Sequence, residues 1–586
     1  MSIQQTDTLE IRIDGLVSQM TLAEKIGQMT QIEKNSIPAE DVTNYFIGSV
    51  LSGGGGNPTP NTPDTWAKMV REYQEAALKT RLAIPLLYGS DCVHGHNNVY
   101  GATLFPHNIG LGATHDEKLV YEIAQVTAKE MLATGVHWNF APAVSVPQDV
   151  RWGRTYEGFS ENTDVVIKMS TAYIRGLQAS GILPSIKHFV ADGGAKWNTT
   201  IKPADQQANW QGVTDSYSID QGDAQIDEET LRRVHLAPYV AAVKEGVLNI
   251  MVSHSSWQGL KMHAHHYLLT TVLKGELGFQ GFLVSDWMSI NQLDPDFYTC
   301  VVRSINAGLD MIMVPFDYKL FIETLSRAVA NGDVSQERID DAVRRILRAK
   351  FSLGLFEQPF GNDELIAEFG SDAHRALARE AVRKSLVLLK NENNLLPLAK
   401  SGDQILVAGC GANDIGMQCG GWTISWQGDY GATTVGTTLL EGMQQATSAD
   451  VQYHATGDFG AAQAPLGIVV VGEKPYAEGV GDKGDLTLSM EEADLVKSMR
   501  QRCDKLILIV LSGRPLVIAE EHALADAVIA AWQPGTEGAG VADVLFGDYP
   551  FVGKSTYTWS RDAAQVSLDA LKANPGAVLI PFGYSS

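Results

Sequence analysis

The sequence predicts an α/β protein: a (β/α)8 TIM-barrel-like domain followed by a second α/β sandwich domain. Over roughly the first 350 residues, short apolar segments rich in β-branched residues alternate with longer amphipathic stretches. Such alternation is typical of βαβ units around a parallel sheet. About seven or eight units in that length fit a closed barrel better than an open sheet. A shorter alternation of apolar segments and helical stretches follows these residues and predicts the second domain.

The expected barrel elements follow this alternation from the N-terminus. Residues 16–32 form an amphipathic pattern in which Thr21 and Glu24 have the spacing of a capping box. The expected strands are 48–51, 85–91, 137–144, 185–190, 249–254, 281–287 and 311–315. The expected helices lie near 65–80, 116–134, 164–180, 228–246, 265–276 and 335–353. Gly354 is a C-cap signal after the last helix, so we assign residues 1–355 to the barrel.

The second domain is expected after a looser passage with several glycines and a proline, residues 356–373, which we interpret as the linker. A helix over 374–389 should open this domain, which extends to residue 586. Its expected strands are 404–409, 467–472, 505–512 and 528–532. Helical segments between them predict an open sandwich with helices on both faces.

One long polar passage, residues 194–226, interrupts the barrel pattern. It is rich in Gln and Asp and has no hydrophobic period. A loop of this length in a compact domain is either functional or disordered. Its place just after a strand end predicts that it lies on the catalytic face of the barrel.

Composition excludes several classes of function. The 586 residues carry a formal charge of −23, which argues against nucleic acid or an anionic membrane as a partner. The five scattered cysteines predict neither a disulfide framework nor a zinc site. No apolar run approaches the roughly 20 residues of a membrane span, and no signal peptide precedes the first helix. The chain is therefore expected to be soluble and cytoplasmic as written, or periplasmic or secreted if a leader has been removed.

Polar side chains gather where the expected strands end. Asp286 and Trp287 close the 281–287 segment, and Lys187 and His188 lie in the 185–190 segment. Others follow the remaining strands: Asp91, His94, Arg151, Arg154 and His254. Each has an ordinary explanation by itself, such as a helix cap for Asp286. Together, on successive strand ends of a barrel, they predict one polar ligand pocket.

The residue types in this pocket favour glycoside hydrolysis. Tryptophans suit the apolar face of a sugar ring, and the sequence offers Trp257, Trp287, Trp422 and Trp426. No GxSxG, HExxH or complete dinucleotide fingerprint is present, so we expect no cofactor and no metal. Glycoside hydrolysis needs two carboxyl groups. The pattern supplies Asp286 as one of them and leaves several candidates for the second.

Several motifs resemble those of glycoside hydrolase family 3, most closely its two-domain exo-acting β-glucosidases and β-glucan glucohydrolases. The resemblance runs nearly end to end. The motifs include Asp91-Cys92-Val93-His94-Gly95-His96, Arg151-Trp152-Gly153-Arg154, Lys187-His188-Phe189, Val284-Ser285-Asp286-Trp287 and Gly472-Glu473-Lys474-Pro475-Tyr476-Ala477-Glu478.

The resemblance implies a retaining double displacement at a junction between two domains. Asp286 matches the family nucleophile, and Glu478 matches an acid/base that the second domain delivers. The family residues that bind the hydroxyls of the terminal glucose correspond here to Asp91, Arg154, Lys187 and His188. Trp287 and Trp426 match the pair of indoles around the next sugar. The expected substrates are β-linked gluco-oligosaccharides or aryl β-glucosides, and retention predicts carboxyl groups about 5–5.5 Å apart.

Some features depart from the family pattern. His254 is expected to border the substrate pocket at a position where an aromatic residue is common. Thr155 replaces a cysteine of some plant members, and the chain ends soon after Tyr584 without a third, fibronectin-like domain. The alternatives are a β-xylosidase, a β-N-acetylglucosaminidase, or a sugar-binding protein on an inactive scaffold. A β-N-acetylglucosaminidase is disfavoured because the motif that these enzymes usually carry is not present after Lys187. An inactive sugar-binding protein is disfavoured because both carboxyl residues are present.

Overall fold

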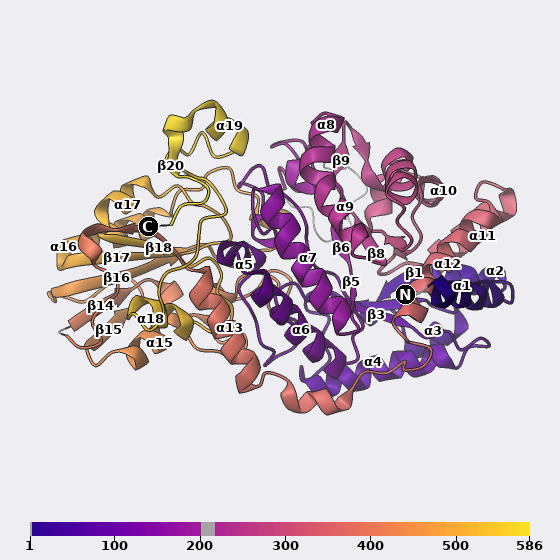
Figure 1. The fold of residues 1–586 in the computed structure, drawn as a ribbon, viewed down its shortest axis with the longest axis horizontal. Coiled ribbons are helices and arrows are strands. Elements are labelled where there is room, and N and C mark those ends of the chain that lie inside the picture. The colour runs from indigo at the N-terminus through magenta and orange to yellow at the C-terminus, as the bar shows by residue number, and fades with distance from the viewer. Residues whose placement is uncertain (1–2, 201–216, 403, 586) are drawn as a thin grey trace.

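The fold consists of a parallel barrel followed by a second, mixed α/β sheet. A computed structural model describes residues 3–200, 217–402 and 404–585. The barrel and the second sheet lie side by side, with the N-terminal end of the chain in the half that contains the barrel and the C-terminal end in the half that contains the second sheet (Figure 1). The predicted fold class is confirmed.

The barrel wall is a nearly continuous ring of parallel strands. One sheet has the order β12-β1-β2-β3-β4-β5 and another the order β11-β8-β6. Parallel bridges from Ala143 to Lys187 and from Val284 to Met311 join the two sheets into a ring. The strands are β1 (Thr30–Glu33), β2 (Ser49–Ser52), β3 (Leu87–Ser90), β4 (Trp138–Asn139), β5 (Leu183–Pro184), β6 (Ile186–Phe189), β8 (Asn249–Val252), β11 (Phe282–Val284) and β12 (Ile312–Met313). All are buried, although several carry polar side chains, such as Gln31 in β1 and Lys187 in β6.

Helices cover the outside of this ring, and many begin with a side-chain cap. Thr62, Asp116 and Asn162 accept backbone N–H groups at the starts of three of them. The predicted capping box of Thr21 and Glu24 is confirmed at α2. The main helices are α1 (Ile3–Val17), α2 (Leu22–Gln28), α4 (Pro63–Leu78), α6 (Glu117–Ala133), α7 (Thr163–Ala179), α9 (Ala237–Lys244), η6 (Tyr267–Glu276), α10 (Phe297–Ala307), α11 (Tyr318–Asn331) and α12 (Gln336–Ser352).

Two predicted helices are wrong in part. The expected helix 16–32 is divided among the end of α1, α2 and the strand β1, which the sequence analysis missed. The expected helix 374–389 ends earlier, because α13 (Asp372–Ser385) gives way to β13 (Val387–Asn391). Both errors concern a short strand that begins two residues after the end of a helix, where periodicity does not separate helix from strand. Helices α10 and α11 and strand β15 (Asp450–His454) were also missed.

The second sheet is parallel except at one edge. Its order is β13-β18-β17-β16-β14-β15, and only β13 runs antiparallel to its neighbour in this described sheet. The remaining strands are β14 (Gln404–Ala408), β16 (Ala464–Gly472), β17 (Cys503–Leu511) and β18 (Ala527–Ala530). Helices α16 (Met490–Arg502) and α17 (Ala519–Leu524) lie on one face, and α13, α15 (Leu439–Ala446) and α18 (Ala539–Leu545) lie on the other (Figure 1).

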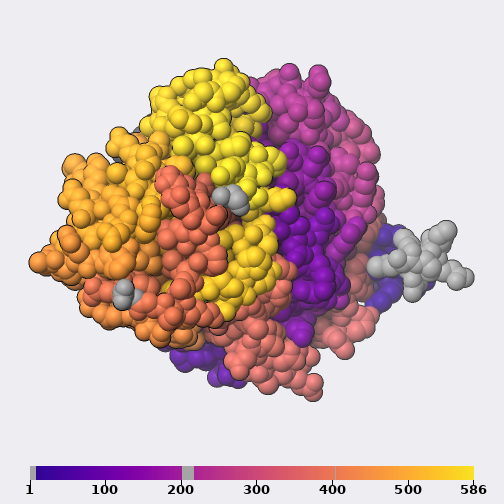
Figure 2. Space-filling view, turned by 60° about the vertical axis from the view of Figure 1, so that its left-hand side comes forward, coloured from indigo at the N-terminus to yellow at the C-terminus, as the bar shows by residue number. Residues whose placement is uncertain are grey.

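The two halves are packed closely together. The orange and yellow surface of the second half abuts the purple and magenta surface of the barrel (Figure 2). Lys384 of α13 forms an ion pair with Asp116 at 2.9 Å, and the hydroxyl of Tyr156 donates to the carbonyl of Tyr476 at 2.7 Å. Within the described ranges, no helix is both long and apolar enough to cross a membrane.

Candidate active site

A cavity of about 350 Å3 lies at the C-terminal ends of the barrel strands, where the second half of the chain meets the barrel. The side chains to which the family resemblance gave a role, and His254, all line it: Asp91, Arg154, Lys187, His188, His254, Asp286, Trp287, Trp426 and Glu478. Trp422 lines it as well, whereas Trp257 does not and donates to the carbonyl of Ile226 instead. His94 and Arg151, which were also predicted in the pocket, do not line the cavity: His94 bonds to the carbonyl of Phe105, and Arg151 pairs with Asp149.

Asp286 is held in one orientation just after β11. Its Oδ1 accepts the backbone N–H of Trp287 at 2.6 Å, and its own backbone N–H donates to Nε2 of His263 at 3.1 Å. Burial would raise the pKa of this carboxyl, but His254, His188 and Arg154 outweigh it and hold the pKa well below its usual range. The group is therefore an anion under ordinary conditions, as a nucleophile requires.

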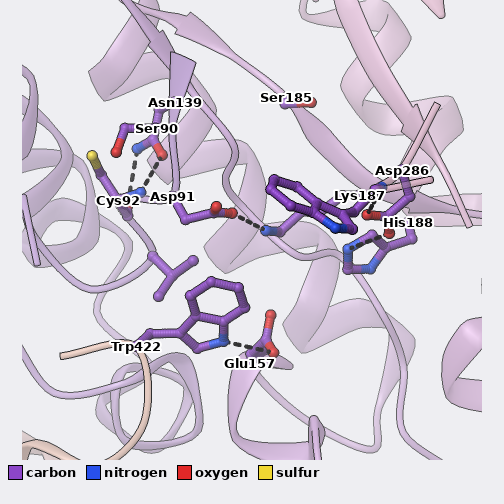
Figure 3. A network of polar contacts seen from close by, with 12 residues as sticks. Ser90, Asp91, Cys92, Asn139, Glu157, Ser185, Lys187, His188, Asp286 and Trp422 are labelled. Carbon is purple, nitrogen blue, oxygen red and sulfur yellow. Dashed lines mark hydrogen bonds and ion pairs between the residues drawn. The ribbon is translucent and has the colours of Figure 1, made fainter. Parts of the chain in front are cut away.

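Lys187 and His188 reach the cavity from β6. Lys187 Nζ lies 3.2 Å from Oδ1 of Asp91, the residue that follows β3. Nε2 of His188 lies 3.7 Å from Oδ2 of Asp286, and its Nδ1 is 3.0 Å from Oδ2 of Asp192. Figure 3 shows Lys187 between Asp91 and the His188–Asp286 pair. Burial first, and then Arg154, lower the pKa of His188, so a neutral ring oriented by Asp192 faces the cavity.

Arg154 is the centre of the charged groups in the site. Its Nη2 donates to Oε2 of Glu157 at 2.9 Å and contacts Nε2 of His188 at 3.2 Å. Its Nη1 lies 3.3 Å from Oε1 of Glu478. Arg154 is 6% exposed, and Trp422 donates through Nε1 to the other oxygen of Glu157 at 3.3 Å. Glu157 was not predicted from the sequence, although its place three residues after Arg154 could have suggested it.

Glu478 lies on a short loop after β16 and has a left-handed backbone, with φ of 55°. Such a conformation is uncommon for a residue with a side chain and often occurs at functional sites. Burial raises the pKa of Glu478 to about 8, Arg154 opposes the shift, and Asp220 and Asp286 add to it. The two carboxyl groups therefore have opposite states near neutral pH: Asp286 is ionised and Glu478 is protonated.

The loop of Glu478 is tied to the barrel on both sides. Asp482 accepts the backbone N–H of Gly153 at 2.8 Å through Oδ1. Its Oδ2 accepts the N–H groups of three consecutive residues, Ser218, Ile219 and Asp220, at 2.7–2.9 Å. Arg514 donates to the carbonyls of Gly481 and Arg151, at 2.5 and 2.9 Å. These bonds fix the loop of the second half relative to the barrel.

Indole rings form part of the cavity wall. Trp287 follows Asp286, and Trp426 comes from the loop after α14 (Ile415–Cys419). A Cβ added to Gly54 would lie 2.6 Å from the Cα of Trp426, so the glycine allows the second half to approach the barrel this closely. Lys187 Nζ lies 5.6 Å from the centre of the Trp422 ring.

The predicted 194–226 insertion contributes to the cavity in its described part. Tyr217 and Gln221 line the cavity, which agrees with a position on the catalytic face. Residues 201–216 of the predicted insertion lie outside the described residues. A Cβ added to Gly479 would lie 2.3 Å from the Tyr217 ring, so this tyrosine packs against the loop of Glu478. No local pattern in the sequence singled out Tyr217.

The site combines an ionised carboxylate, a protonated carboxyl, fixed cations and flat apolar rings. In the ranges 3–200, 217–402 and 404–585, no group of three or more His, Cys, Asp or Glu side chains is placed to hold a metal ion. The arrangement can attack an electrophilic carbon with one carboxyl group and protonate a departing oxygen with the other.

Comparisons of the sequence with known protein families and proteins agree on one family. The model of the glycosyl hydrolase family 3 N-terminal domain matches residues 21–349, and the model of its C-terminal domain matches residues 386–585. The chain is 33% identical to a lysosomal β-glucosidase of Dictyostelium discoideum, over 95% of this chain and 73% of that protein. These matches confirm the resemblance that the motifs indicated.

Solved structures agree with the sequence relatives. An exo-1,3/1,4-β-glucanase from a Pseudoalteromonas species aligns with a TM-score of 0.90 and 39% identity, over 99% of this chain and 74% of that one. A mutant β-glucosidase of Listeria innocua in complex with laminaribiose aligns with a TM-score of 0.81 and 26% identity, over 97% of this chain and 78% of that one.

Proposed function

The chain belongs to glycosyl hydrolase family 3, and from this premise we propose that it is a retaining β-glucosidase of the exo-β-glucanase type. It releases glucose from the non-reducing ends of β-glucosides and β-gluco-oligosaccharides. The observation that carries the proposal is the pair of carboxyl groups in one cavity, with the pKa of Asp286 lowered and that of Glu478 raised to about 8.

In the first step, an oxygen of Asp286 attacks the anomeric carbon of the terminal glucose. The bond from that carbon to the glycosidic oxygen breaks, and Glu478 gives its proton to the leaving oxygen. A covalent ester then joins Asp286 to the sugar. Arg154, which lowers the pKa of Asp286, stabilises the ionised nucleophile before the attack, and the neutral ring of His188 lies 3.7 Å from Oδ2 of Asp286.

In the second step, water attacks the same carbon and releases Asp286. Glu478 is now a carboxylate and takes a proton from that water. Formation of the ester removes the negative charge of Asp286, one of the groups that raise the pKa of Glu478. The pKa of Glu478 therefore falls while it acts as a base, and glucose leaves with its β configuration retained.

We assign the binding of the terminal glucose to Asp91, Arg154, Lys187 and His188. All four line the same cavity and offer charged or hydrogen-bonding atoms to sugar hydroxyls. His254 borders the same site, with Nε2 3.6 Å from Oδ1 of Asp286. Trp287 and Trp426 are assigned to the sugar on the leaving side.

The proposed domain boundaries follow the two family matches. Residues 1–355 form the catalytic barrel, 356–373 the linker, and 374–586 the domain that supplies the loop of Glu478. In support, the family models end at residue 349 and begin again at residue 386.

A panel of p-nitrophenyl β-glycosides tests the proposed specificity. We expect the β-glucoside to be hydrolysed with a higher kcat/KM than the β-xyloside or the β-N-acetylglucosaminide. If the glucoside is the poorest of the three, the chain acts on a different sugar. If none is hydrolysed while glucose still binds, the protein is a sugar-binding member of the family.

A further inference from the structure

One side of the cavity contains side chains to which the proposed mechanism gives no role. Around the barrel mouth the strands follow the order β11, β12, β1, β2 and β3. The barrel residues to which a role in glucose binding or catalysis is assigned do not follow β12, β1 or β2. At or after the ends of these three strands, the cavity is lined by Phe316, Glu33, Asn35 and the glycine run 53–56.

Phe316 extends the aromatic wall that Trp287 begins. The centres of the two rings lie 5.5 Å apart at an angle of 83°, an edge-to-face contact. Phe316 is 39% exposed although it is a large apolar side chain. An apolar ring kept partly open in a polar cavity suits the flat face of a pyranose.

Glu33 is a buried carboxylate that lines the same side of the cavity. It is 7% exposed and ends β1, and its backbone N–H donates to the carbonyl of Pro315, the residue before Phe316, at 3.3 Å. Its two oxygens accept the N–H and the Nδ2 of Asn35 at 2.7 and 2.9 Å. Each oxygen keeps a further lone pair. Burial raises the pKa of Glu33, so hydroxyl donors from a ligand would stabilise its ionised form.

The glycine run leaves this part of the cavity without side chains. A Cβ on Gly53 would lie 3.7 Å from Cζ3 of Trp287, and Gly54 lies against the backbone of Trp426. An aromatic ring, a carboxylate and an amide therefore surround open space next to both tryptophans assigned to the leaving sugar.

We propose that Phe316, Glu33 and Asn35 form a binding subsite for a second sugar unit on the leaving side of the bond that is cleaved. The ring of Phe316 stacks on that sugar, and Glu33 and Asn35 bind its hydroxyls. This inference rests on the proposed function, since it names the substrates of the same site: β-gluco-oligosaccharides of three or more units, in preference to disaccharides and small aryl glucosides.

The test compares kcat/KM for three substrates: a β-linked glucose trisaccharide, the disaccharide of the same linkage, and p-nitrophenyl β-glucoside. The wild-type protein should favour the trisaccharide over the disaccharide. Phe316→Ala should lower the trisaccharide value roughly 3- to 10-fold, as expected for one aromatic stacking contact. The p-nitrophenyl value should stay within about twofold, since that substrate is too short to reach the subsite.

Three further variants separate the possible causes. Phe316→Tyr keeps the ring and should keep the preference for the trisaccharide. Glu33→Gln keeps the size of the side chain and should also reduce the trisaccharide value selectively. Leu320→Ala, at an exposed position on α11 outside the cavity lining, is the matched control and should change nothing.

Two results would overturn the inference while the proposed function stands. One is a wild-type protein that cleaves the disaccharide and the trisaccharide equally well. The other is an equal loss on all three substrates in Phe316→Ala, which would mean that Phe316 only supports Trp287. If the wild-type protein cleaves none of the three substrates, the proposed function fails, and the inference fails with it.

Discussion

Arg154 and Glu478 lie 3.3 Å apart, Nη1 to Oε1, although one follows a barrel strand and the other follows a strand of the second sheet. The contact joins the group assigned as acid/base to the charged side chains around Asp286. The site therefore exists only when the two halves of the chain are packed together, and its electrostatics depend on the loop of Glu478.

Glu478→Ala should lower kcat/KM for oligosaccharides by about 10²- to 10⁴-fold, the range typical of general acid catalysis. Substrates with an activated aryl leaving group should lose much less, since they need no proton. Azide should restore turnover of these activated substrates and yield the β-glucosyl azide, which NMR identifies. An α-glucosyl azide would mean that the reaction inverts, and the retaining mechanism would be wrong.

The pH profile of kcat/KM should fall on its basic side as Glu478 loses its proton, near pH 8. Asp220 raises the pKa of Glu478, so Asp220→Asn should move this limb to lower pH. Asp223→Asn, in the nearby strand β7 (Asp223–Ala224), is the matched control and should leave the limb in place. A basic limb that does not move in Asp220→Asn would remove Asp220 from the electrostatics of the acid.

Asp482→Ala should misplace the loop of Glu478, because it removes the acceptor of four backbone N–H groups. A displacement of this kind costs up to about 10²-fold in rate. The loss should fall on oligosaccharides, which need the acid, and should spare a dinitrophenyl glucoside. Equal losses on both substrates would point to general damage to the fold.

Asp526→Ala is the control for that experiment. Asp526 is also a buried carboxylate that accepts a backbone N–H, from Leu506 at 2.8 Å, but it lies before β18, at the end of the second sheet where its parallel strands begin. It should change the free energy of unfolding without changing the ratio of kcat/KM between the two substrates.

Asp286→Asn should abolish turnover and leave the fold and the binding of glucose intact. The amide has nearly the size of the carboxylate but lacks the charge that attacks the anomeric carbon. Calorimetry with glucose should report binding while hydrolysis of every glucoside is lost. Turnover at the wild-type rate would exclude Asp286 as the nucleophile.

Much of this architecture was predictable from local patterns. The alternation of apolar segments and amphipathic helices predicted the barrel and the second sheet, and residues at strand ends predicted the barrel side of the cavity. These features depend on short stretches of sequence. The buried strand β1 was missed because three of its four residues, Thr30, Gln31 and Glu33, are polar and it begins two residues after the end of α2.

The partners of Asp286 were harder to predict. Glu478, Asp482 and Arg514 reach the barrel only through the packing of two halves distant in sequence, and no periodicity encodes that contact. Only the motif resemblance pointed to Glu478 as the proposed partner. Tyr217 and Phe316 had no such signal, and their place in the cavity comes from the fold alone. Glu157 does not line the cavity but accepts a hydrogen bond from Arg154, which does.

The most direct test of the account is to identify the residue that becomes bound to the sugar. A 2-deoxy-2-fluoro-β-glucoside with an activated leaving group forms the covalent intermediate but slows its hydrolysis. Mass spectrometry of the digested protein should then find a fluoroglucosyl group on the peptide that contains Asp286, attached to that residue. A label on another carboxyl residue, or none in a protein that hydrolyses glucosides, would contradict the proposed mechanism.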